Sequence, residues 1–171
     1  MIKKAIKITL SILLLLVVLL VGTGLGAYLY LKPDEAPLRL LSPDTVRVVE
    51  NGELIGFESQ NDTYAWLGIP YSAPPVGELR WKAPQPPEQW TGRFEALEFG
   101  SECPQKAIGP SAEQNGVNGA EDCLFLNIWA PAATKGLAPA DRERRPVMFW
   151  IHGGANVMGS GGHGIYNGAR L

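Results

Sequence analysis

The chain has 171 residues, enough for one ordinary domain, and its 46% hydrophobic and 19% charged composition is typical of globular rather than disordered proteins. Residues 1–32 hold four of the fifteen basic residues and no acidic one, which leaves 11 basic against 17 acidic residues, a net charge of −6, in the remainder. This acidic balance argues against nucleic acid as a partner, because phosphates require a basic protein face.

An uncharged run of 24 residues, Ile8 to Leu31, follows three lysines near the N-terminus. As a helix with about 1.5 Å rise per residue it would reach roughly 36 Å, enough to cross a hydrocarbon core of about 30 Å. Because Tyr28 to Lys32 ends the run with residues typical of a membrane interface, we expect residues 1–32 to be a signal anchor. The alternative is a cleaved signal peptide with its small residues, Gly22 to Ala27, near the cleavage site. In both cases the lysines predict export of the remainder, either membrane-anchored or secreted.

Residues 33–45 are rich in proline and acidic residues, so they are expected to form an extended linker. After the linker, two β-forming segments, Val46 to Val49 and Leu54 to Phe57, flank Asn51-Gly52. That pair suits the left-handed backbone of a tight turn, which predicts a small antiparallel hairpin.

A short strand is expected over Tyr64 to Ile69, where it is stopped by Pro70. The following proline-rich stretch should be an ordered loop, with Trp81 and Trp90 as its apolar anchors. Further along, a polar and glycine-rich loop over Ile108 to Gly119 precedes an alternating segment that predicts another strand, Cys123 to Trp129.

The segment Pro146 to Ile151 has no polar face, which predicts a central sheet strand buried on both sides. It ends in His152-Gly153-Gly154, at the carboxyl end of the sheet where open α/β folds bind ligands. Glycine amides can converge on a tetrahedral oxyanion without a Cβ in the way. By spacing alone, a structural turn or a nucleotide-binding loop remains an alternative, although the phosphate-binding sequence patterns are absent.

Several segments, in this order, resemble the type-B carboxylesterase and cholinesterase family, bacterial carboxylesterases included. They are Leu67 to Tyr71, Pro74 to Gly77, Leu79 to Trp81, Glu121 to Asn127 and Trp150 to Gly154. The Glu-Asp-Cys-Leu-Phe-Leu-Asn segment is the most specific. The resemblance implies an α/β-hydrolase fold, with residues 46–171 as its N-terminal part: a small hairpin and the first strands of the central sheet.

The resemblance also implies roles for the glycine-rich turn. The backbone N–H groups of Gly154 and Ala155 would form the oxyanion hole, and His152 and Gly153 would support the loop. Asn156 stands where the family commonly has an aromatic residue, so a more polar or roomier acyl pocket is expected. No metal or cofactor is needed for this chemistry.

Two structural pairs are implied in the same way. Cys103 and Cys123 should form a disulfide, whereas their position in an exported chain alone leaves two separate buried thiols as an alternative. Arg80 and Glu121 should form an ion pair. The segment between the cysteines has no aromatic residue, which argues against choline esters, because cholinesterases hold the ammonium group there on a tryptophan.

No residue of the chain is expected to be a nucleophile or general base. His152 belongs to the loop motif, His163 lies among glycines as a solvent-facing residue, and neither Ser111 nor Ser160 has the Gly-x-Ser-x-Gly context. The serine, acid and histidine of a triad should follow Leu171. We therefore expect an inactive N-terminal fragment of a serine esterase that acts on small carboxylic esters. The alternatives are an inactive cholinesterase-like binding protein and a truncated product without function.

Overall fold

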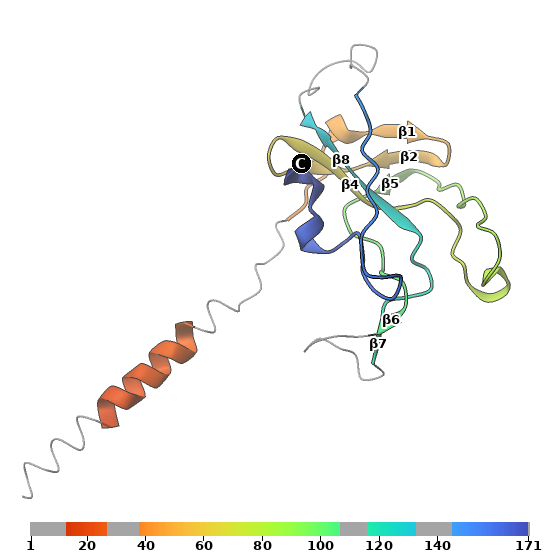
Figure 1. Cartoon of the computed structure of the whole chain (residues 1–171). Coiled ribbons are helices and arrows are strands. Elements are labelled where there is room, and N and C mark those ends of the chain that lie inside the picture. The colour runs from red at the N-terminus through yellow and green to blue at the C-terminus, as the bar shows by residue number, and fades with distance from the viewer. Residues whose placement is uncertain (1–12, 27–37, 107–115, 133–144, 171) are drawn as a thin grey trace, which may run out of the picture. The chain divides into compact units, whose positions relative to one another are not determined.

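The computed structural model describes residues 13–26, 38–106, 116–132 and 145–170 (Figure 1). The chain divides into two units, Met1–Leu38 and Arg39–Leu171, which we describe separately. In the second unit the described residues form strands and short 3₁₀ turns and contain no α-helix. The described residues of this unit therefore contain only the β-part of the expected α/β architecture.

In the first unit, residues 13–26 are α-helical and their leucine and valine side chains are exposed. Across the described stretches of the chain, no helix has both the length and the apolar character required to cross a membrane. The other parts of the Ile8 to Leu31 run lie outside the described residues. The predicted anchor, residues 1–32, is therefore described only over residues 13–26.

The predicted hairpin is confirmed. Strand β1 (Arg47–Val49) pairs antiparallel with β2 (Gly52–Ile55), and Val49 lies opposite Gly52. The turn residues are therefore Glu50 and Asn51 rather than the predicted Asn51-Gly52, and Phe57 lies outside the hairpin. Gly52 has φ +137°, a backbone conformation that L side chains rarely adopt. Strand β5 (Arg93–Glu95) adds to the other edge of β2 in parallel and completes a three-stranded sheet.

A second sheet has the order β3 (Phe57–Ser59), β4 (Thr63–Pro70) and β8 (Phe125–Pro131), with both pairs antiparallel (Figure 1). Both strands predicted for this region therefore form. Strand β4 includes Pro70, whereas the prediction ended the strand at Ile69. The β4–β8 register shifts between Trp66 and Ile69. Gly68 lies at this irregularity with φ +65°, and its N–H donates to Asn127 Oδ1 at 2.9 Å.

Strand β4 is buried on both faces, because alternate side chains of a strand point to opposite sides. Tyr64 and Trp66 belong to one core cluster, together with Leu54, Ile69 and Ala96. Ala65 and Leu67 belong to a second cluster with Phe57. This strand therefore joins the two halves of the hydrophobic core.

The end of the expected linker is part of the fold. Thr45, in the 3₁₀ turn η1 (Pro43–Thr45), has no exposed surface. Its Oγ1 accepts from Gly56 N at 2.8 Å, and its carbonyl accepts from Trp66 Nε1 at 2.8 Å. The linker prediction is thus wrong at this end, because these bonds satisfy a polar residue inside the core. Residues 33–37 lie outside the described residues.

The two tryptophans expected to hold the proline-rich loop behave differently. Trp90 packs against Phe94, with 5.2 Å between ring centroids, and its Nε1 donates to Glu53 O at 2.7 Å. Trp81 is 97% exposed and has φ +62°. Trp90 is therefore an anchor as predicted, whereas Trp81 anchors nothing among the described residues.

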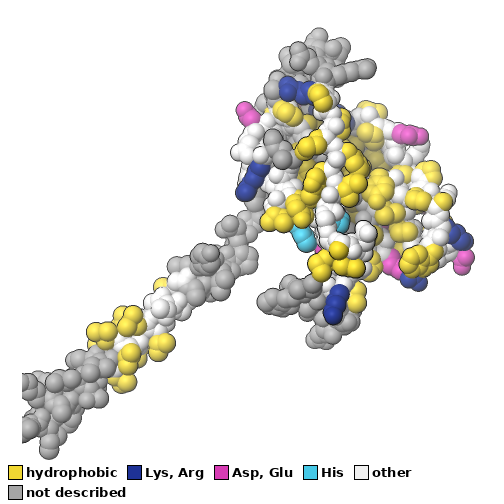
Figure 2. Space-filling view, viewed as in Figure 1, with side chains coloured by type: hydrophobic (Ala, Val, Ile, Leu, Met, Phe, Trp, Pro, Cys, Tyr) yellow, Lys and Arg dark blue, Asp and Glu magenta, His cyan; other side chains and the backbone are white. Residues whose placement is uncertain are grey.

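The expected central strand over residues 146–151 does not form. The segment pairs with no strand in the described chain, and Val147, Phe149 and Ile151 are 89%, 81% and 76% exposed. Figure 2 shows hydrophobic side chains gathered on this face of the molecule. A strand with two apolar faces requires hydrogen-bonded neighbours on both edges, and the described residues supply none.

The close approach of β3 and β4 yields a prediction about stability. A Cβ on Gly56 would lie 2.0 Å from Ala65 O, inside the core. We expect Gly56→Ala to lower the free energy of unfolding by about 3 kcal/mol, because the strands must separate to make room. The matched control is Gly164→Ala, where a Cβ meets no atom within 4 Å. Urea denaturation should give equal midpoints for this control and the parent protein; equal midpoints for all three would contradict the prediction.

Candidate active site

The glycine loop, residues 152–158, is a tight turn that follows the exposed segment. Gly154, Ala155 and Asn156 have φ values of +134°, +54° and +59°. Gly154 O accepts from Val157 N at 3.0 Å and from Met158 N at 3.2 Å, so the turn is closed by its own backbone.

Gly154, Ala155 and Asn156 differ in how well each residue type tolerates its positive φ. A Cβ on Gly154 would lie 1.8 Å from Met158 O, so only glycine fits there. Ala155 occupies the left-handed region, which costs an L-residue about 1 kcal/mol. Asn156 tolerates this region better than most residues do. The asparagine therefore has a backbone role in addition to any role in a pocket.

Two adjacent amides of the loop are available to a ligand. No atom of the described residues accepts a hydrogen bond from the N–H of Gly154 or of Ala155. Gly154 is half-buried and Ala155 is exposed. Successive backbone N–H groups in such turns form concavities that bind anions. The loop thus presents donors of the kind that its glycine pattern predicts.

His152 lies at the base of the loop. Its Nδ1 is 2.9 Å from Gly153 O, and the ring packs against Gly159. A histidine that acts as a catalytic base needs a carboxylate to orient its ring. Among the described residues, no carboxylate pairs with His152. This position fits the loop-supporting role that the family resemblance implies.

The other candidates for chemistry are engaged locally. His163 is exposed, as expected of a solvent-facing loop residue; its Nε2 lies 3.7 Å from Glu102 Oε2, and its ring is parallel to that of Tyr166 with 6.3 Å between centroids. Ser160 Oγ accepts from Gly162 N at 3.0 Å. Ser111 lies outside the described residues.

Both expected structural pairs are present. Cys103 and Cys123 form a disulfide with their Cα atoms 5.0 Å apart. Arg80 Nε lies 2.8 Å from Glu121 Oε1, with side chains 54% and 43% exposed. An ion pair this open to water contributes at most about 1 kcal/mol to stability. Neither pair touches the glycine loop.

Gln105, which no sequence motif singles out, does touch the segment that follows the loop. Its Nε2 donates to Gly159 O at 3.0 Å, and Gly159 N donates to its Oε1 at 2.7 Å. The only sequence signal for Gln105 is its place two residues after Cys103.

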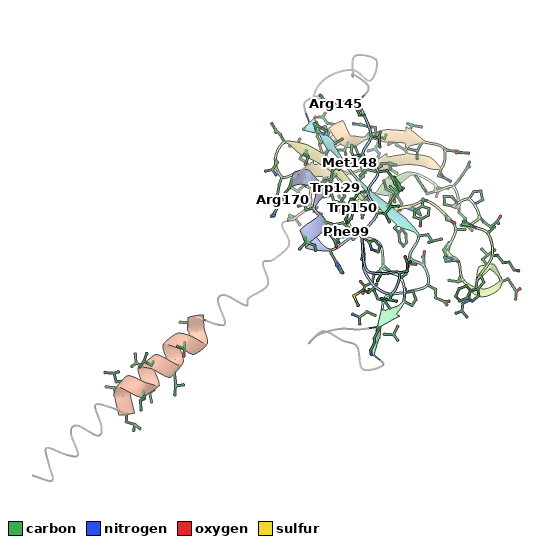
Figure 3. The ribbon with its side chains drawn as sticks, viewed as in Figure 1. Phe99, Trp129, Arg145, Met148, Trp150 and Arg170 are labelled. Carbon is green, nitrogen blue, oxygen red and sulfur yellow. A yellow bond between two sulfur atoms is a disulfide. The ribbon has the colours of Figure 1, made fainter. Side chains whose placement is uncertain are left out.

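Aromatic rings before and after the loop pack in pairs. Trp150 packs with Tyr166 at 4.4 Å between ring centroids, and Phe99 with Trp129 at 6.4 Å. Figure 3 labels Phe99, Trp129 and Trp150.

Comparison with known sequences identifies relatives of this chain. Residues 43–171 match the family model described as the carboxylesterase family. The chain is 42% identical over 114 residues to the para-nitrobenzyl esterase of Bacillus subtilis (strain 168), a match that covers 66% of this chain and 22% of that protein. It is 39% identical over 132 residues to the fumonisin B1 esterase of Sphingopyxis macrogoltabida, covering 75% and 22%.

Solved structures give the same result. A PNB esterase structure superposes with a TM-score of 0.61 at 35% identity, covering 74% of this chain and 24% of that chain. The Geobacillus stearothermophilus carboxylesterase EST55 superposes with a TM-score of 0.56 at 41% identity, covering 72% and 23%. The 171 residues thus span about a quarter of the length of these relatives.

Proposed function

The chain belongs to the carboxylesterase family, and on that premise we propose that the protein it is part of hydrolyses carboxylic esters through an acyl-enzyme. The observation that supports this most directly is the glycine loop, in which two adjacent backbone N–H groups have no hydrogen-bond acceptor among the described residues. The nucleophile, its base and the acid would come from residues outside these 171. The glycine loop would be the oxyanion hole.

In this proposal the loop acts when the serine oxygen bonds to the ester carbonyl carbon. The carbonyl π electrons move onto oxygen, and the N–H groups of Gly154 and Ala155 donate to the resulting oxyanion. The base takes the serine proton during the attack and gives it to the leaving oxygen, so collapse of the tetrahedral intermediate breaks the ester C–O bond and releases the alcohol. Water then releases the acid by the same route. Each donor of this kind contributes about 2.7 to 4 kcal/mol to transition-state stabilisation.

The exposed segment 146–151 fits the same proposal. In a complete α/β-hydrolase sheet it would be a central strand, with hydrogen-bonded neighbours supplied by the remainder of the protein. Its exposed side chains would then be buried. The arrangement would fix the glycine loop at the carboxyl end of that strand.

Asn156 is proposed to line the acyl side of the ester site. Its side chain is polar and smaller than the aromatic residue common at this place in the family. It is exposed in the described structure and follows the donor amides directly. An ester with a longer or more polar acyl group is therefore the expected substrate. Choline esters are not expected, because the segment between Cys103 and Cys123 has no aromatic residue to hold the ammonium group.

We also propose that the protein works outside the cytoplasm. The disulfide between Cys103 and Cys123 supports this, because such bonds persist in oxidising compartments. The lysines that precede the apolar N-terminal run support it independently.

The oxyanion assignment can be tested one atom at a time in the full-length protein. Replacing Ala155 by lactic acid, its α-hydroxy analogue, exchanges the N–H for an ester oxygen and keeps the side chain. We expect kcat for a p-nitrophenyl ester to fall by about 10² to 10³. The matched control is the α-hydroxy analogue of Ile165, a residue 81% exposed whose N–H also bonds no described acceptor.

Equal kcat values for the two analogues would refute the oxyanion assignment. No hydrolysis by the unaltered, folded protein would favour the inactive binding protein instead.

The acyl-pocket proposal predicts that Asn156→Phe shifts ester preference toward shorter acyl chains, because the ring occupies the space beside the donor amides. The control is Asn156→Ala, which imposes a similar backbone cost at φ +59° without the ring. The measurement is kcat/KM across p-nitrophenyl esters of increasing length. Parallel profiles for both variants and the parent would rule out this pocket.

If residues 1–32 direct export, a protein that lacks them should stay in the cytoplasm with its two cysteines reduced. Fractionation followed by gel-shift labelling with a maleimide polymer measures both properties. The unaltered chain should appear in the exported fraction with Cys103 and Cys123 protected from labelling. The same distribution and labelling for both chains would contradict the proposal.

A further inference from the structure

We propose that Gln105 is a positioning residue for the glycine loop, acting through the backbone of Gly159. The inference rests on the proposed esterase function for its catalytic meaning. Its structural content stands on the contacts between residues 99–106 and residues 159–163. These two segments are far apart in sequence and are brought together only by the fold.

The carboxamide of Gln105 uses both of its ends on one residue. Nε2 donates to Gly159 O at 3.0 Å, and Oε1 accepts from Gly159 N at 2.7 Å. A carboxamide, with its acceptor oxygen and donor nitrogen, can satisfy a donor and an acceptor of the same backbone residue at once. Gln105 is half-buried, so water competes less for these bonds than it would at an exposed position.

Gly159 in turn contacts the base of the glycine loop. A Cβ there would lie 2.5 Å from Gly153 O and 2.6 Å from His152 Nδ1, so the Gly159 backbone packs directly against both residues. Its φ of +116° leads the chain away from the turn in a conformation that favours glycine. Fixing the backbone of Gly159 therefore fixes one side of the loop.

Gln105 is itself well anchored. Two residues earlier, Cys103 is joined to Cys123, and strand β6 (Gln105–Lys106) pairs with β7 (Val117–Asn118). Gln105 Nε2 also donates to Cys103 O at 3.1 Å. The glutamine thus connects a cross-linked segment to the end of the loop.

Two further contacts hold the same pair of segments together. His163 lies 3.7 Å from Glu102, and Gly162 packs against the Phe99 ring. Loss of the Gln105 bonds should therefore loosen the loop without detaching the segment that follows it. The effect should appear in donor placement more than in global stability.

The kinetic consequence follows from the geometry of oxyanion binding. Donors must lie about 2.7 to 3.1 Å from the developing charge, and a misplacement of about 1 Å can cost roughly 10² in rate. The ground-state carbonyl depends less on these donors. Loss of Gln105 should accordingly lower kcat and leave KM nearly unchanged.

The test compares Gln105→Met with Gln85→Met in the full-length protein. Methionine keeps the length of the side chain and removes both hydrogen-bonding groups. Gln85 is the matched control, since its exposed Nε2 also donates to a backbone carbonyl, Ala83 O at 3.1 Å, in the proline-rich loop. Three readouts are needed: kcat and KM for p-nitrophenyl butyrate, the inhibition constant of a trifluoromethyl ketone, and hydrogen exchange of residues 152–160.

For Gln105→Met we expect kcat to fall by about tenfold or more, with KM within about twofold. The inhibition constant should rise in parallel, because the ketone adduct contains the oxyanion. Exchange should accelerate within residues 152–160 only. Gln85→Met should match the parent in every readout.

Unchanged exchange and unchanged kcat in Gln105→Met would overturn the inference. So would faster exchange across the whole chain, which would make Gln105 a general stability residue. An unaltered protein that does not hydrolyse esters, combined with locally faster exchange in the variant, would refute the proposed function and leave the positioning role supported.

Discussion

The burial of β4 on both faces is the constraint on which the rest of the structure depends. A strand covered on both sides must have hydrogen-bonded neighbours and apolar layers above and below. Strands β3 and β8 supply the neighbours, and the core clusters of Trp66 and Leu67 supply the two layers. The C-terminal segment is fastened to the same sheet, because Asn61 Nδ2 donates to Ala169 O at 2.9 Å and Gly168 packs against Trp129.

Elements with a local cause could be predicted from the sequence. The hairpin around Asn51 and Gly52 and the apolar run of β4 could each be predicted from a few neighbouring residues, although the hairpin turn itself is at Glu50 and Asn51. Thr45 could not be assigned to the core, because its burial depends on bonds to Gly56 and Trp66 that only the fold creates. In the segment 146–151 the apolar pattern predicts a strand, but the strand does not form because the described residues include no strands to pair with it.

The candidate site divides in the same way. A tight turn with free amides at Gly154 and Ala155 could be expected from the motif, because the groups concerned are backbone groups in a contiguous stretch. The left-handed conformation of Ala155 has no signal in its residue type, whereas asparagine at position 156 is only weakly indicative of it. Gln105 could not be found, since its partner Gly159 lies 54 residues away in the sequence.

These differences have one physical origin. A hole made of backbone N–H groups has no side chain of its own to adjust, so its geometry is determined by whatever holds the chain on either side. Inside the loop, Gly154 O closes the turn with Val157 N and Met158 N. Outside it, the carboxamide of Gln105 fixes Gly159, and the disulfide fixes the segment that contains Gln105. If the loop is the proposed oxyanion hole, donor placement depends both on the turn itself and on side chains outside the motif that never meet the substrate.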